Sequence, residues 1–158
     1  MLNKILKLSR DKLISRKQTI SVAESCTGGL VCSLLTKHPG ASAYFILGAV
    51  VYSNKAKEKI LGIPGKTIAK YGAVSGEVAV LMAKNIRRKI NTDFGISITG
   101  IAGPAGATPV KPAGTVFIAL STKNKTLCRS FLFRGNRESI RKHSALEAIR
   151  LLCAHLSR

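Results

Sequence analysis

The chain has 158 residues, 46% of them hydrophobic, which supports one domain with a single well-filled core. It carries 26 Lys and Arg residues against 7 Asp and Glu residues, a formal net charge of +19, and no apolar run is long enough to cross a membrane. Four cysteines without a C-x-x-C pair or a histidine cluster argue against a zinc site and a disulfide framework.

Apolar periodicity and turn residues predict alternating helices and strands. Residues 2–16 have an apolar face of Leu and Ile and are expected to form an amphipathic helix, not an export signal, so we expect a cytoplasmic protein. Ser75, and either Ser53 or Asn54, are predicted to cap helices. Further helices are expected over residues 27–36, 55–61, 66–71, 76–90 and 137–156. Strands are expected over residues 19–23, 44–52, 94–99, 115–121 and 127–133.

The order of these elements predicts an α/β fold. Helices alternate with strands as far as residue 99, and a hairpin then precedes the final helix. This order is typical of a mixed sheet with helices on both faces. We therefore expect one domain over residues 1–158, a three-layer α/β/α sandwich with a mostly parallel sheet and a C-terminal hairpin plus helix.

The pentad Ser25-Cys26-Thr27-Gly28-Gly29 lies between a predicted strand and a predicted helix. A hydroxyl at such a junction can point into a cleft, and the two glycines allow a substrate to approach the backbone closely. At the start of a helix, the backbone N–H groups near Thr27, Gly28 and Gly29 are expected to be free to bind an oxyanion or a phosphate. Ser25 is therefore a candidate nucleophile.

A serine nucleophile needs a base, and lysine is a better candidate here than histidine. None of the three histidines has a recognisable orienting carboxylate, which argues against a Ser-His-Asp triad. Tyr52 and Lys57 follow the second predicted strand, and parallel strand ends open onto one crevice, so both are expected near Ser25. Partial burial and the helix N-terminus are expected to lower the pKa of Lys57 so that it can act as a base. The alternative is that Lys57 is an exposed helix lysine and Tyr52 a strand-end aromatic with a solvated hydroxyl.

A glycine-rich loop follows the third predicted strand, and it fits neither the dinucleotide-binding pattern nor the Walker A pattern. The loop residues expected to permit close contact with a ligand are Thr99, Gly100, Ala102 and Gly103. Arg137 and Arg141 are four residues apart at the start of the last predicted helix, so they share a face and could bind a phosphate. The alternative for this pair is a solvated basic face.

The excess of basic residues has two explanations. It could serve nucleic-acid binding, or it could be spread over a solvated surface. The basic residues are scattered, without a long basic tail or interleaved aromatic residues, which favours the solvated surface. In either case the charge would steer an anionic small substrate toward the protein.

Six segments resemble, in order, the signatures of the CinA C-terminal domain family, and the resemblance extends from about residue 3 to the end of the chain. They are residues 23–29 (AESCTGG), 51–57 (VYSNKAK), 72–75 (GAVS), 99–104 (TGIAGP), 111–116 (KPAGTV) and 133–137 (FRGNR). The resemblance implies the deamidation of nicotinamide mononucleotide to nicotinate mononucleotide and ammonia. It also implies the stand-alone form of the domain, a homodimer or higher homo-oligomer, with no metal or other cofactor.

By this resemblance, Ser25 is the nucleophile, Lys57 the general base and Tyr52 the hydroxyl that assists proton transfer. The glycine-rich loop and Arg137 or Arg141 are expected to hold the ribose phosphate. The chain departs from the usual family pattern at Ala107 and Asn136, where a glycine and an aspartate are common, and these departures bear on phosphate affinity. Two competing hypotheses are a nucleic-acid-binding protein and a catalytically idle nucleotide-binding module on the same fold.

Overall fold

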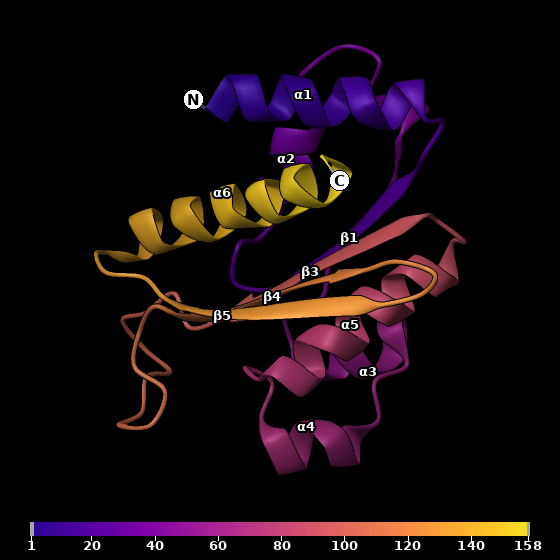
Figure 1. Cartoon of the computed structure of the whole chain (residues 1–158). Helices are drawn as coiled ribbons and strands as arrows, with labels where there is room; N and C mark the ends of the chain where they lie inside the picture. Colours follow the sequence, from indigo (N-terminus) through magenta and orange to yellow (C-terminus); the bar gives the residue numbers. More distant parts are fainter. Residues whose placement is uncertain (1, 158) are drawn as a thin grey trace.

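The computed structural model describes residues 2–157, which form a five-stranded sheet between two layers of helices (Figure 1). The strands are β1 (Ile20–Glu24), β2 (Phe45–Val50), β3 (Phe94–Gly100), β4 (Thr115–Ser121) and β5 (Thr126–Leu132). The helices are α1 (Leu2–Ser15), α2 (Leu30–Leu35), α3 (Asn54–Leu61), α4 (Gly65–Tyr71), α5 (Gly76–Lys89) and α6 (Arg137–Leu156). None of the helices within residues 2–157 combines the length and apolarity that crossing a bilayer requires. The position of the sheet between two layers of helices confirms the predicted α/β/α sandwich.

The sheet is mixed, with the strand order β2-β1-β3-β4-β5. Strand β1 pairs in parallel with both β2 and β3, and β4 pairs antiparallel with β3 and β5. Four strands therefore share one direction, and only β4 runs against them. The register aligns Glu24 at the end of β1 with Val50 of β2 and Ile98 of β3. As a result, the carboxyl ends of the three parallel strands meet at one edge of the sheet, where ligands bind in open α/β folds.

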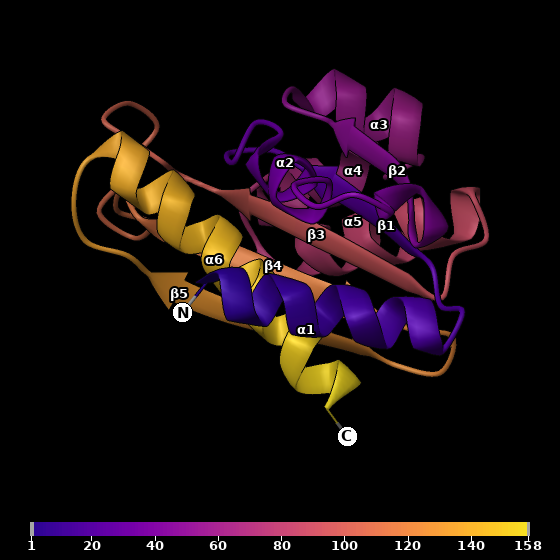
Figure 2. The same ribbon diagram turned by 90° about the horizontal axis from the view of Figure 1, so that it is seen from above.

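Each face of the sheet has its own apolar core. Helices α1, α2 and α6 cover one face, with α1 and α6 lying side by side, and helices α3, α4 and α5 cover the other (Figures 1 and 2). Every residue of β1 is buried, and so is all of β3 except its last residue, because both strands are central and covered on both faces. The edge strand β2 alternates between half-buried and exposed residues.

Side-chain caps confirm the predicted starts of three helices. Ser53, Ser75 and Asn136 each accept a backbone N–H bond at the start of α3, α5 and α6. Asn136 therefore retains the capping function at one of the two departures from the family pattern. Helix α2 differs from the prediction, since it begins at Leu30 and not at residue 27.

Helix α2 begins late because Gly28 and Gly29 adopt φ values of 60° and 97°, a left-handed turn that glycine enters without steric cost. A buried carboxylate then caps the helix from the preceding strand. Glu24 has no exposed surface, and its Oε2 accepts the N–H groups of Gly29 and Val31 while its Oε1 accepts that of Cys32. The last residue of β1 thus satisfies the free N–H groups of α2, where a negative charge is also favoured by the helix dipole.

Replacing Glu24 by Ala is expected to lower the free energy of unfolding by about 3 kcal/mol or more, because one buried and two partly buried N–H groups lose a charged acceptor. Chemical denaturation measures this loss. The matched control is Glu58→Ala, which removes an exposed carboxylate from α3 and should change stability little. Equal losses in the two variants would contradict the capping role of Glu24.

Candidate active site

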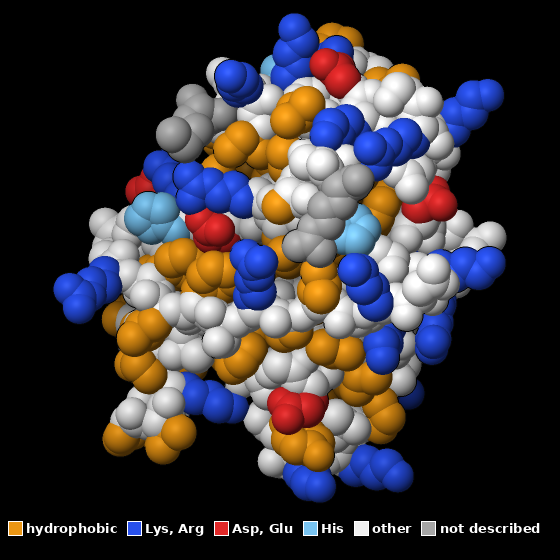
Figure 3. Space-filling model, viewed as in Figure 1, with side chains coloured by type: hydrophobic (Ala, Val, Ile, Leu, Met, Phe, Trp, Pro, Cys, Tyr) orange, Lys and Arg blue, Asp and Glu red, His pale blue; other side chains and the backbone are white. Residues whose placement is uncertain are grey.

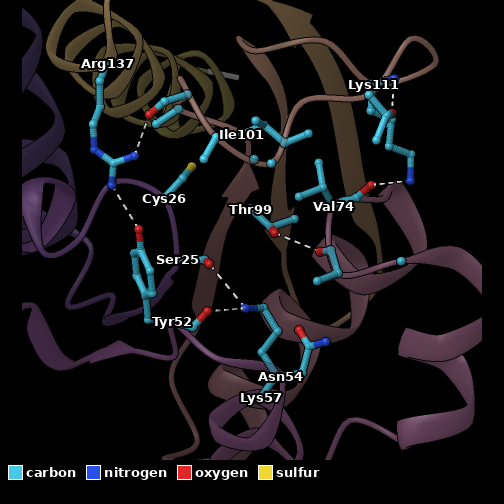
Figure 4. A pocket seen from close by; sticks show the side chains of 18 residues that line it. Ser25, Cys26, Tyr52, Asn54, Lys57, Val74, Thr99, Ile101, Lys111 and Arg137 are labelled. Atoms are coloured by element: carbon cyan, nitrogen blue, oxygen red, sulfur yellow. Dashed lines mark hydrogen bonds between the residues drawn. The ribbon is translucent and has the colours of Figure 1, made fainter.

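A cavity of about 390 Å³ opens at the carboxyl ends of the three parallel strands. Ser25 and Cys26 follow β1, Tyr52 follows β2, and the loop over residues 101–114 follows β3. Polar side chains from these segments and from α3 and α6 face the cavity (Figure 4). They are Ser25, Tyr52, Asn54, Lys57, Thr99, Thr108, Lys111 and Arg137.

Ser25 and Lys57 lie in direct contact at the base of this cavity (Figure 4). The Nζ of Lys57 lies 3.2 Å from the Oγ of Ser25, and it also donates to the carbonyl oxygens of Val51 at 2.9 Å and Tyr52 at 3.2 Å. Lys57 is only 1% exposed, although it lies in the first turns of α3. The structure therefore excludes the interpretation of Lys57 as an exposed helix lysine.

Burial also controls the ionisation of this amine. It lowers the pKa of Lys57, because removing the side chain from water destabilises the charged form. No carboxylate among the described residues forms an ion pair with Lys57, so no ion pair raises the pKa of Lys57 again. The neighbouring thiol behaves in the opposite sense: burial raises the pKa of Cys26 to about 12, which keeps it protonated and a poor nucleophile.

Tyr52 lines the cavity, but its hydroxyl does not join the pair. The hydroxyl accepts a hydrogen bond of 2.9 Å from the guanidinium of Arg137, and the side chain is 58% exposed. Figure 4 shows the ring extending from the backbone near Lys57 toward Arg137. The contribution of Tyr52 to the base is instead its carbonyl oxygen, which accepts from Lys57. Ser25 and Lys57 thus contact each other directly, and the assistance expected from the Tyr52 hydroxyl stays a prediction.

Two of the three expected oxyanion donors of the pentad are already engaged. The N–H of Gly28 donates to the carbonyl of Ser25, and that of Gly29 donates to Glu24. Thr27, Gly28 and Gly29 also lie outside the residues that line the cavity. The N–H groups of Gly28 and Gly29 are therefore not free to bind an oxyanion or a phosphate in this structure, whereas that role for Thr27 stays a prediction.

The glycine-rich loop and one of the two arginines reach the cavity. Thr99, Gly100, Ala102 and Gly103 all line it. Arg137 donates to the carbonyl of Gly103 at 2.7 Å as well as to Tyr52, so it joins the loop to the end of β2. Arg141 instead donates twice to the carbonyl of Thr27 and does not line the cavity. Of the two arginines predicted to bind the phosphate, only Arg137 lines the cavity.

Sequence reasoning missed the roles of Asn54 and Lys111 in the wall of the cavity. Asn54 is the first residue of α3, four residues after β2 ends, and Lys111 lies in the loop that leads into β4. The only signal in the sequence was that both residues are polar and lie near the boundary of a predicted strand. Neither position could be assigned without knowing which loops meet over the sheet edge.

The basic residues on the face shown in Figure 3 are dispersed among hydrophobic and neutral side chains. They do not form one continuous stripe on that face, the pattern expected for a nucleic-acid groove. Among residues 2–157 there is also no group of three or more side chains of the types that hold a metal ion.

Solved structures of bacterial proteins of similar size have the same fold. A competence or damage-inducible protein from Enterobacter asburiae superimposes with a TM-score of 0.95 at 31% identity, covering 99% of this chain and 98% of that one. The competence/damage inducible protein CihA from Agrobacterium tumefaciens gives a TM-score of 0.90 at 35% identity, with coverage of 98% and 96%. The likeness therefore spans the whole domain.

Curated relatives include longer proteins. A CinA-like protein from Leptospira biflexa is 51% identical over 143 residues, which are 90% of this chain and 34% of the relative. A CinA-like protein from Anaeromyxobacter sp. (strain Fw109-5) is 49% identical over 141 residues, 89% of this chain and 34% of the relative. The chain thus spans about a third of the length of these relatives. The family model of the CinA C-terminal domain matches residues 2–156. The chain therefore belongs to the CinA C-terminal domain family.

Proposed function

We propose that this domain is a serine–lysine amidohydrolase that converts nicotinamide mononucleotide to nicotinate mononucleotide and ammonia. The observation that carries the proposal is the contact of 3.2 Å between the Oγ of Ser25 and the buried amine of Lys57. The substrate comes from the resemblance of the six sequence segments. A homo-oligomeric state is part of the same proposal.

The surroundings of Lys57 suit a neutral amine that acts as a base. A neutral amine has two N–H bonds and one lone pair. The carbonyl oxygens of Val51 and Tyr52 accept the two N–H bonds, which leaves the lone pair to face Ser25. Burial lowers the pKa of Lys57 and so increases the fraction of amine in this form. Ser25 then donates its proton to Nζ, the activation that a serine nucleophile needs.

The reaction follows from this proton exchange. The Oγ of Ser25 forms a bond to the carboxamide carbon as its proton passes to Lys57. The tetrahedral intermediate then expels the amide nitrogen, which takes the proton from Lys57 and leaves as ammonia. Lys57 next removes a proton from water, whose oxygen attacks the acyl carbon. Collapse of the second intermediate returns the proton to Ser25 and releases the carboxylate.

The oxyanion requires a donor other than Gly28 and Gly29. The backbone N–H of Cys26 is the candidate, because Cys26 lines the cavity directly after the nucleophile. In other serine hydrolases, the residue after the nucleophile commonly supplies this N–H group. Lys111 and Arg137 supply positive charge at the wall of the same cavity, which suits a substrate with a phosphate group.

Replacing Ser25 by Ala is expected to reduce ammonia release from nicotinamide mononucleotide about a thousandfold or more, because the bond to the acyl carbon cannot form. A coupled ammonia assay measures this loss. The control is Ser130→Ala, which removes an exposed hydroxyl from β5. Robust turnover by the Ser25 variant would falsify the covalent mechanism.

Activity is expected to rise with pH to a plateau, because Lys57 must lose its proton before it can accept one from Ser25. The midpoint of kcat/KM should lie below the ordinary lysine pKa, in the direction that burial imposes. Lys57→Arg should lose about a hundredfold or more at every pH, since a guanidinium stays protonated. Lys55→Arg, at an exposed position of the same helix, is the control. A pH profile unchanged in the Lys57 variant would exclude Lys57 as the base.

The same ionisation should appear in stability without any substrate. The pKa of Lys57 is lowered in the folded protein, so the unfolded chain binds more protons between that pKa and the ordinary value. Unfolding free energy therefore rises with pH through this window, and the stabilisation is lost as pH falls. Lys57→Met should lack this increment. Denaturation at several pH values compares the two slopes, and identical slopes would show that Lys57 is not held neutral.

A further inference from the structure

The wall of the cavity carries positive charge without a carboxylate to balance it. Lys57, Lys111 and Arg137 line the cavity, and no Asp or Glu is among its lining residues. Lys57 is at the base, beside Ser25, whereas Lys111 and Arg137 approach from different sides of the cavity (Figure 4). An anionic group on the substrate therefore has two cations available, and the contacts of each differ.

Lys111 is held firmly across the cavity from the side of the 101–114 loop. Its backbone N–H donates to the Oγ1 of Thr108, and its carbonyl accepts the N–H of Thr108, so the loop folds tightly around it. The Nζ donates to the carbonyl oxygens of Tyr71 at 3.0 Å and Val74 at 2.7 Å. These contacts attach the loop to the segment between α4 and α5.

Gly72 makes room for this amine. A Cβ atom at Gly72 would lie 3.3 Å from the Nζ of Lys111, and the residue has a φ of 81°, which glycine adopts readily. The backbone at this turn can therefore come close to the ammonium group and present its carbonyls to it. The position of Lys111 is thus built by residues from two separate segments.

An ammonium group has three N–H bonds, and the contacts with Tyr71 and Val74 account for two of them. Both acceptors are neutral, so the charge itself is not balanced. Glu77 borders a separate hollow on the far side of Lys111, and no ion pair joins the two. Among the described residues, no hydrogen bond or ion pair occupies the third N–H, and Lys111 lines the cavity that also holds Ser25.

Arg137 differs in both exposure and contacts. Each of its terminal nitrogens donates one N–H bond, to the carbonyl of Gly103 and to the hydroxyl of Tyr52, so three of its five N–H bonds are not accounted for, and the residue is exposed. Lys111 is half-buried, and a charge shielded from water attracts an opposite charge more strongly. Both cations therefore keep N–H bonds for a ligand, and the lower exposure of Lys111 favours it over Arg137 as the residue that binds an anion.

We infer that Lys111 binds the phosphate group of the nucleotide and makes the site discriminate between the nucleotide and its unphosphorylated nucleoside. The inference rests on the proposed function, since it assigns one end of the proposed substrate. The fixed carbonyl contacts hold the ammonium in place before the substrate arrives, so little side-chain entropy is lost on binding. The residue is thus specificity-determining and takes no part in the proton transfers.

The test measures binding, in the Ser25→Ala background, so that no turnover occurs. Calorimetry compares nicotinamide mononucleotide with nicotinamide riboside, which lacks the phosphate, for proteins with Lys111 intact and with Lys111→Met. Loss of Lys111 should weaken mononucleotide binding about 10- to 100-fold, because a charge-assisted hydrogen bond is lost. Riboside binding should change less than about threefold, within the range of an altered neutral contact. Lys66→Met, on the exposed surface of α4, controls for the loss of one charge, and Arg137→Met is measured in parallel.

The outcomes separate the two ideas. If Lys111→Met weakens both ligands equally, Lys111 only fastens the loop and the inference is wrong. If Arg137→Met alone removes the preference for the mononucleotide, the phosphate belongs to Arg137 and the inference is again wrong. If the mononucleotide does not bind even when Lys111 is intact, the proposed function itself fails. Thermal melting of each variant shows that the fold is retained, and Lys111→Arg, which keeps the charge, should restore part of the preference.

Discussion

The site depends on a lysine amine that is enclosed at the carboxyl ends of the parallel strands without a carboxylate partner. Burying an ammonium group unpaired is costly, and the protein relieves that cost by lowering the pKa of Lys57. Two backbone carbonyls fix the amine beside Ser25. The carbonyls belong to Val51 and Tyr52, directly after β2, so the sheet edge itself orients the base.

The same edge shows how one buried charge decides what a neighbouring segment can do. Glu24, the last residue of β1, caps the helix α2 that follows it. Its carboxylate thereby occupies the N–H groups that a helix start otherwise offers to an anion. The glycines of the pentad therefore serve the turn that lets the chain leave the strand. Ser25 remains at the cavity because its N–H continues the sheet pairing with the carbonyl of Ile98.

Charge is arranged differently in the cavity and in the rest of the fold. The cap of α2 pairs an acid with N–H groups, whereas the cavity wall holds cations through neutral oxygens. Arg137 contacts a carbonyl and a hydroxyl, and Lys111 contacts two carbonyls. Cations held in this way keep their positive potential, because no fixed anion cancels it. The wall of the cavity therefore presents positive potential, which suits the anionic substrate proposed above.

Local sequence patterns by themselves determined most of the helix and strand bounds, the sheet class, and the positions of Ser25 after one strand and Lys57 in the helix that follows another. Periodicity and capping act over a few residues, so they can be read along the chain. Tertiary structure alone decided that Arg137 takes the hydroxyl of Tyr52, 85 residues away, and that Arg141 reaches the carbonyl of Thr27, 114 residues away. It also decided that Glu24 accepts the N–H groups at the start of α2 and that Lys111 lines the cavity. These outcomes depend on which distant groups compete for the same donors and acceptors, and that competition is settled only when the segments pack together.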